Sequence, residues 1–117
     1  MRVPILKQGS YLIATIQSAL TDEDLVRLRD DLATQVNKFR ARGVIVDVTV
    51  LDVMDSFATR TLRDLAQMIR LRGAATVICG IQPEVAFTMV QLGLELGKVE
   101  TALDLEEGLA LLGRKSQ

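Results

Sequence analysis

The sequence predicts an α/β fold, a mixed and mostly parallel sheet with four helices packed on it. Short apolar runs alternate with longer segments in which apolar residues recur at three- and four-residue spacing, as strands alternate with amphipathic helices. Two short runs at the start, separated by Gln8-Gly9-Ser10, have the pattern of a hairpin. The 117 residues are enough for one domain, predicted to span 1–117, in the order strand, strand, helix, strand, helix, strand, helix, strand, helix.

The first three elements are a hairpin and a helix. Apolar runs at 3–6 and 11–16 predict the two strands. Thr21 is placed to cap the helix, with Asp24 three residues later reaching back in a variant of the capping box. Gly43 is expected to end this helix as a C′ glycine. The residues expected to face inward are Leu25, Leu28, Leu32, Val36 and Phe39.

A buried strand and a second helix form the centre of the sequence. The run 44–50 is apolar at most positions, which is typical of a strand covered on both faces, although Asp47 interrupts it. The helix begins at Asp55 or Ser56, and Gly73 closes it. Its inward stripe is expected to contain Ala58, Leu62, Leu65, Ala66 and Ile69.

The remaining elements follow the same alternation. Residues 75–79 form the next predicted strand, and Pro83 stands in the first turn of a third helix, where its missing N–H costs nothing. Residues 98–100 are a candidate edge strand. Asp104 is expected to cap the last helix, with Glu107 in its acidic first turn. The apolar residues of these two helices are Val85, Ala86, Met89, Val90, Leu92, Leu105, Leu109 and Leu112.

Composition excludes several functional classes. Hydrophobic residues make up 49% of the chain and aromatic ones 3%, so the core is expected to be aliphatic. The 14 Lys and Arg against 15 Asp and Glu provide no basic field for nucleic acid or an anionic membrane, so neither is an expected partner. Histidine is absent, which excludes Ser-His-Asp and Cys-His catalysis and most zinc sites. We predict a protein that is not an enzyme and holds no cofactor.

The single cysteine and the absence of long apolar runs bear on location. Cys79 cannot form an internal disulfide, which fits a reducing compartment. No signal-peptide pattern and no run near the roughly 20 residues of a membrane span is visible. The expected location is the cytoplasm. A nucleophilic role for Cys79 is disfavoured, because no histidine exists to activate it and a buried free cysteine behaves as a small hydrophobic residue.

The strand-to-helix connection around Ser56 is the strongest candidate site. A serine at a helix N-terminus lies beside unpaired backbone N–H groups and the positive end of the helix dipole, where an attached anion is tolerated. The ordinary explanation is that Asp55 or Ser56 is only a helix cap. Phe57, Met54 and Met89 are predicted to form an exposed patch around this polar centre, as at a protein interface.

Three aspartates follow or interrupt the same strand. Asp47, Asp52 and Asp55 lie where α/β proteins place their sites, and three carboxylates there would hold Mg²⁺ for phosphoryl transfer. The ordinary explanation is that Asp52 and Asp55 are turn and cap residues, and that Asp47 accepts hydrogen bonds from nearby backbone N–H groups. We favour this second explanation and keep the magnesium enzyme as a remote alternative.

The segment VIVDVTVLDVMDSFATRTL resembles the signature of STAS domains, the fold of bacterial anti-sigma-factor antagonists. The resemblance extends to the initial hairpin, to CGIQPEVAFTMVQLGLEL and to TALDLEEGLALL. Within the family the sequence is most similar to the small STAS-only scaffold subunit of the stressosome, through its DSF triplet and its GIQPEVA and ETALDLEEGL segments.

This resemblance implies a non-catalytic phosphoprotein that takes part in signal transduction and the stress response. It implies that a serine/threonine switch kinase phosphorylates Ser56, that a phosphatase removes the phosphate, and that the unmodified scaffold holds the kinase in an oligomeric assembly with STAS-containing sensor proteins. Asp55 matches the acid before the phosphoserine, and Asp47 the acid at the strand end. Thr59, one turn further along the helix, is a candidate minor phosphorylation site. The expected partner-binding residues are Asp52, Met54, Asp55 and Phe57.

One departure from the family pattern separates two functions. Many soluble antagonists follow Asp-Ser with a small residue and Gly, whereas this chain has Phe57-Ala58-Thr59. The difference favours the scaffold over the alternative, a free anti-sigma-factor antagonist that binds an anti-sigma kinase.

Overall fold

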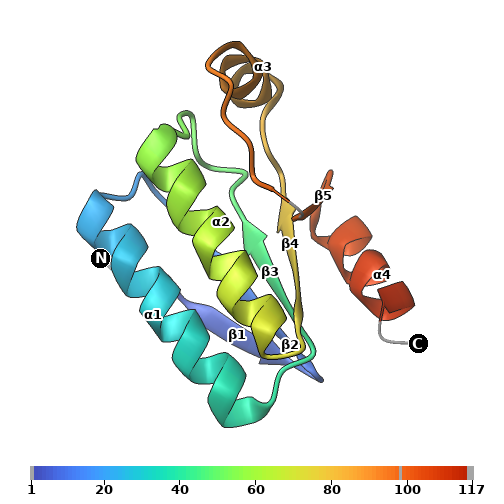
Figure 1. The fold of residues 1–117 in the computed structure, drawn as a ribbon. Helices are drawn as coiled ribbons and strands as arrows, with labels where there is room; N and C mark the ends of the chain where they lie inside the picture. Colours follow the sequence, from blue (N-terminus) through green and yellow to red (C-terminus); the bar gives the residue numbers. More distant parts are fainter. Residues whose placement is uncertain (1, 98, 116–117) are drawn as a thin grey trace.

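The computed structural model describes residues 2–97 and 99–115, which form a five-stranded sheet and four helices (Figure 1). The elements are β1 (Ile5–Gln8), β2 (Tyr11–Thr15), α1 (Asp22–Phe39), β3 (Gly43–Asp47), α2 (Ser56–Leu71), β4 (Ala75–Cys79), α3 (Pro83–Gln91), β5 (Glu100–Ala102) and α4 (Leu105–Lys115). This order of elements confirms the α/β fold class predicted from the sequence.

The sheet is mixed, and its strands lie side by side in sequence order from β1 to β5. The β1–β2 hairpin is antiparallel, with Gln8 paired to Tyr11 across the turn, and every later pair is parallel. A helix connects each pair of parallel strands, as parallel pairing requires. The carboxyl ends of β2, β3, β4 and β5 therefore meet at one edge of the sheet.

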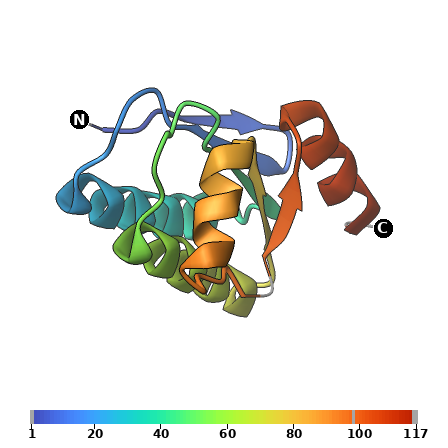
Figure 2. The same ribbon diagram turned by 90° about the horizontal axis from the view of Figure 1, so that it is seen from above.

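Helices cover both faces of the sheet. Helices α1 and α2 pack together on one face, α4 lies on the other, and α3 sits beyond the carboxyl ends of the strands (Figures 1 and 2). The larger apolar core lies beneath α1 and α2, and a smaller one beneath α4. Strand β3 contributes to both, because alternate side chains such as Val44 and Ile45 enter opposite cores. No helix within the described ranges is long and apolar enough to cross a membrane.

The predicted helix caps at both ends of the chain are confirmed. The Asp24 N–H donates to Thr21 Oγ1, and the Thr21 N–H donates to Asp24 Oδ2, each at 3.1 Å, which completes the capping box of α1. The Glu107 N–H donates to Asp104 Oδ1 at 2.9 Å at the start of α4. Sequence reasoning located these helix starts because a cap is a local interaction.

Strands β1 and β5 are shifted along the chain from their predicted positions. Strand β1 covers residues 5–8 rather than 3–6, because the two-residue turn at Gly9, whose φ is +60°, sets the hairpin register. Strand β5 covers residues 100–102 rather than 98–100, and position 98 lies outside the described residues. In both cases pairing with the neighbouring strand overrides the local apolar pattern.

Gly43 and Phe39 also differ from their predicted roles. Helix α1 ends at Phe39 with Arg40 in the left-handed region (φ 50°), and Gly43 is the first residue of β3 rather than a C′ cap. A Cβ on Gly43 would lie 2.7 Å from Leu112 Cδ2, so a side chain at this position would require Leu112 to shift. Phe39 is 40% exposed rather than inward, with the ammonium groups of Lys7 and Lys38 at 5.8 and 5.2 Å from its ring centroid.

Candidate functional site

The site is the loop of residues 48–55 that joins β3 to α2, together with the first turn of α2. It lies at the carboxyl edge of the sheet, between the start of α1 and helix α3 (Figure 2). Leu51 and Met54 are buried in the main core, whereas Val50, Asp52 and Val53 are exposed. These apolar anchors hold the loop against the domain and leave Val50, Val53 and Asp52 at the surface.

Asp47 ends strand β3 and starts the loop. Its Oδ1 accepts hydrogen bonds from the Thr49 N–H at 3.0 Å and from Thr49 Oγ1 at 2.6 Å. The Val48 N–H still donates to the Cys79 carbonyl at 3.0 Å, and the chain then leaves the sheet. The strand predicted over 44–50 thus covers only 43–47, because this aspartate turn competes with continued pairing. The predicted local hydrogen bonding of Asp47 to backbone N–H is confirmed.

A second connection ties the loop to the start of α3. Gln82 is the N-cap residue of α3, and its Nε2 donates to the Thr49 carbonyl at 2.7 Å. Gly80 allows this close approach, since its φ is +81° and a Cβ there would meet the Thr49 side chain and lie 3.1 Å from Thr49 Cα. Sequence reasoning missed Gln82 and Thr49 as site residues, because their contact joins positions 33 residues apart.

Asp55, not Ser56, caps helix α2. Asp55 Oδ1 accepts from the Ala58 N–H at 2.8 Å, and its carbonyl accepts from the Thr59 N–H at 3.0 Å. Ser56 is the first helical residue and is exposed, and its hydroxyl has no hydrogen-bond partner in the described part of the chain. A separate residue therefore meets the need for a cap, and the serine hydroxyl is left available for chemistry.

The expected exposure of three residues is wrong. Thr59 is 1% exposed, and its hydroxyl donates to the Asp55 carbonyl at 2.9 Å, so it is not a surface threonine. Met54 is 3% and Met89 6% exposed, because both fill the core between the loop, α3 and the sheet.

The apolar surface around Ser56 consists instead of two valines and part of an aromatic ring. Val53 is 71% and Val50 49% exposed, and Phe57 is partly buried. The sequence VLDVM already contains this pattern. Its buried residues, Leu51 and Met54, are three positions apart, and an exposed valine precedes each of them. It is hidden because valines in an apolar run predict a strand.

A hollow of about 430 Å³ lies beside the loop, between it and the start of α1. Apolar side chains form most of its wall, and three carboxylates lie on it, those of Asp22, Asp52 and Asp55. Residues from two helices and two loops meet here, so the surface next to Ser56 is concave and not flat.

The other candidate chemistry at this edge finds no support in the geometry. In residues 2–97 and 99–115, no group of three or more acidic, histidine or cysteine side chains is arranged to hold a metal ion, so Asp47, Asp52 and Asp55 do not form the hypothesised Mg²⁺ site. Burial, with smaller effects from the charges of Asp47 and Asp104, raises the pKa of the Cys79 thiol to about 11. A thiol this hard to ionise is a poor nucleophile at neutral pH.

Comparisons with known proteins agree on one family. A family model described as STAS domain matches residues 2–108. The RsbT co-antagonist protein RsbRA of Bacillus subtilis is 33% identical over 98 residues, which is 84% of this chain but 34% of that protein. The chain therefore spans about a third of the length of this curated relative.

Two solved structures match over nearly their whole length. RsbS of Moorella thermoacetica, in a form with a serine-to-glutamate substitution, is 32% identical with a TM-score of 0.84, and the match covers 97% of each chain. A chain from a structure of the molecular architecture of the stressosome is 33% identical with a TM-score of 0.79, and the match covers 97% of this chain and 99% of that one.

Proposed function

Because the chain belongs to the STAS domain family, we propose that it acts without catalysis as a scaffold or antagonist in stressosome-type signalling, and that phosphorylation of Ser56 controls it. Its partners would be a serine/threonine switch kinase, a STAS-containing sensor protein and a phosphatase, within an oligomeric assembly. The unmodified protein sequesters the kinase, and the phosphorylated form releases it. The likeness to RsbS along 97% of both chains supports the scaffold role.

The single observation that carries the proposal is the position of Ser56. Its hydroxyl is exposed and unpartnered in the described part of the chain, on a helix start that Asp55 already caps. A phosphate adds a charge of about −1.5 to −2 at a helix N-terminus, where the dipole stabilises anions. The fold therefore tolerates the modification, and its effect falls on the surface.

The surroundings of Ser56 explain how a phosphate would release a partner. A kinase docked over this loop would cover Val50, Val53 and Phe57, with Asp52 and Asp55 beside them. Met54 acts from below, as the buried anchor that holds the loop in shape. Burying a phosphate dianion in that contact without a cationic partner costs several kcal/mol, or a loss in affinity of roughly a thousandfold.

The first test is phosphate mapping. The purified protein is incubated with the switch kinase of its host and Mg-ATP, and the product is mapped by peptide mass spectrometry. We expect one phosphate, on Ser56, and none on a Ser56→Ala variant. Thr59→Val is the matched control and should be modified like the wild type, because Thr59 is buried. Phosphate that persists on Ser56→Ala would contradict the proposal.

The second test separates release from unfolding. Ser56→Asp should weaken kinase binding strongly in a calorimetric titration and leave the Tm nearly unchanged, because the new carboxylate lies at a helix N-terminus. A large fall in Tm would mean that Ser56 is chiefly structural. Tight binding of an anti-sigma kinase, with no assembly with sensor proteins, would instead identify a free antagonist.

A further inference from the structure

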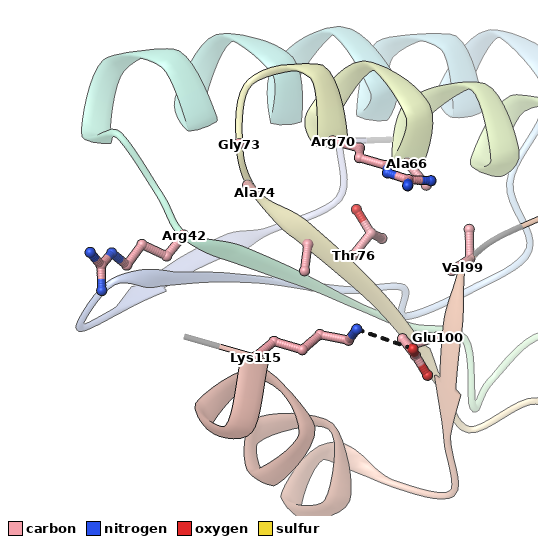
Figure 3. A pocket seen from close by; sticks show the side chains of 10 residues that line it. Arg42, Ala66, Arg70, Gly73, Ala74, Thr76, Val99, Glu100 and Lys115 are labelled. Carbon is pink, nitrogen blue, oxygen red and sulfur yellow. Dashed lines mark ion pairs between the residues drawn. The ribbon is translucent and has the colours of Figure 1, made fainter. Parts of the chain in front are cut away.

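A second cavity lies at the opposite end of the domain from Ser56. It has a volume of about 670 Å³ and opens between the last turns of α2, the start of β4, β5 and the end of α4 (Figure 3). A hollow of about 510 Å³ adjoins it along α2 and shares three lining residues, Ala66, Arg70 and Val99. Both volumes are in the usual range for small-molecule sites.

A buried hydroxyl without a partner lies in the wall of this cavity. Thr76, on β4, is 7% exposed, and its Oγ1 has no hydrogen-bond partner in the described part of the chain. Figure 3 shows its side chain in the space between β4 and α2. Orphaned buried hydroxyls are uncommon, because each forfeits its hydrogen bonds to water. This hydroxyl therefore has a donor and acceptor capacity that the described residues leave unused.

Cationic side chains surround the same space. Arg70 extends from α2 on the same side of β4 as Thr76, and Arg63 lines the adjoining hollow (Figure 3). Neither guanidinium forms an ion pair with a carboxylate of the described residues, although Arg63 Nη1 lies 3.5 Å from the Glu95 carbonyl. Lys115 is paired with Glu100 at 3.1 Å on the far side of β4. Arg70 and Arg63 thus give a local excess of positive charge in a chain whose net charge is −1.

Part of the wall is apolar, beside polar side chains such as Gln67 and Glu100. Ala66 and Val99 border both spaces, and Leu96 lines the adjoining hollow. Guanidinium groups recognise phosphate and carboxylate through paired N–H donors. We propose that the cavity binds a small molecule with a phosphate or carboxylate group on an apolar body, its anion held by Arg70 and the Thr76 hydroxyl and its body by Ala66, Val99 and Leu96.

The proposal is tested with three six-carbon probes that differ only in the head group. Hexyl phosphate, hexanoate and hexylamine are titrated into the ¹⁵N-labelled protein, and the amide shifts of Thr76 and Val99 are followed. The proposal requires saturable shifts at these amides with at least one anion and none with hexylamine. Binding of hexyl phosphate alone identifies a phosphate ligand, and binding of hexanoate alone a carboxylate. No saturable shift with either anion, or equal binding of hexylamine, overturns the proposal.

Two variants test the named contacts. Arg70→Gln should weaken binding of the active probe about tenfold or more, whereas Arg60→Gln, on an exposed part of α2 outside the cavity, should not. Thr76→Val should weaken binding several-fold without lowering the Tm, because it removes a hydroxyl that has no partner in the free protein. Equal losses for Arg70→Gln and Arg60→Gln, or full binding by Thr76→Val, would refute the assigned contacts.

Discussion

One carboxylate, that of Asp55, decides how Ser56 is presented. The cap bond from the Ala58 N–H to Asp55 fixes the start of α2, and the Thr59 hydroxyl closes a second bond to the Asp55 carbonyl. Ser56 is left as the first helical residue, with its side chain outside this arrangement. Asp and Ser are both common N-cap residues, but here Asp55 caps the helix and Ser56 does not.

Removing the cap should therefore destabilise the domain. Asp55→Ala is expected to lower the free energy of unfolding by about 1 kcal/mol, within a range of about 0.5–2, as measured by urea denaturation. Asp52→Ala is the matched control, because Asp52 is exposed in the same loop and makes no cap bond, and it should change stability by less than about 0.5 kcal/mol. Equal losses in the two variants would mean that loop charge, and not capping, is the cause.

At the scale of elements, α4 packs so closely on the sheet that two glycines at the interface have little room for a side chain. Gly43, at the start of β3, faces the Leu112 side chain so closely that a Cβ there would lie 2.7 and 2.9 Å from its two methyl carbons. Gly108, also on α4, would place a Cβ 3.3 Å from Ile45 Cδ1. Small residues on both elements bring the helix near the sheet.

Gly43→Ala should be overpacked and lose about 1–3 kcal/mol of stability in urea denaturation. Gly113 lies on α4, and a Cβ there would meet open space. Gly113→Ala should therefore be neutral or stabilising by about 0.5–1 kcal/mol. In a Leu112→Ala background the penalty of Gly43→Ala should shrink, since the clashing atoms are gone. An undiminished penalty would place its origin in the backbone of β3.

Sequence patterns predicted those features that local interactions determine. The four helices, the caps at Thr21 and Asp104 and the hairpin follow from periodicity and turn chemistry, as does the parallel later part of the sheet from the strand–helix alternation. The loop after β3 was mispredicted because Val50 belongs to an apolar run and is nevertheless exposed. The bond from Gln82 to Thr49 and the role of Gly43 depend on residues brought together only by the fold.

At the scale of the whole molecule, charge is separated along the strands. The first turns of α1 and α4 carry acids such as Asp22 and Glu106, and Asp55 caps α2, whereas the last turns of α1, α2 and α4 carry the bases Lys38, Arg70 and Arg114. Each arrangement complements the helix dipoles. Phosphorylation of Ser56 would increase an existing negative pole, and the proposed anion site lies at the positive one.

The fixed loop also has a consequence for enzyme recognition. Leu51 and Met54 anchor the loop, Gln82 ties it to α3, and Asp55 ends it by capping α2. Ser56 therefore lies on a folded surface and not in a flexible, extended segment. A kinase that acts on this serine must recognise a folded surface, and its specificity would lie in contacts that a linear consensus motif does not contain.

A synthetic peptide of residues 48–62 should therefore be a poor substrate. We expect its kcat/KM with the switch kinase to be about 100-fold or more below that of the folded chain, because the peptide lacks the preorganised contacts that position the hydroxyl. Initial rates measured side by side would decide this, with the Ser56→Ala protein as the blank. Comparable rates would mean that the kinase recognises the linear sequence of this segment after the segment unfolds locally.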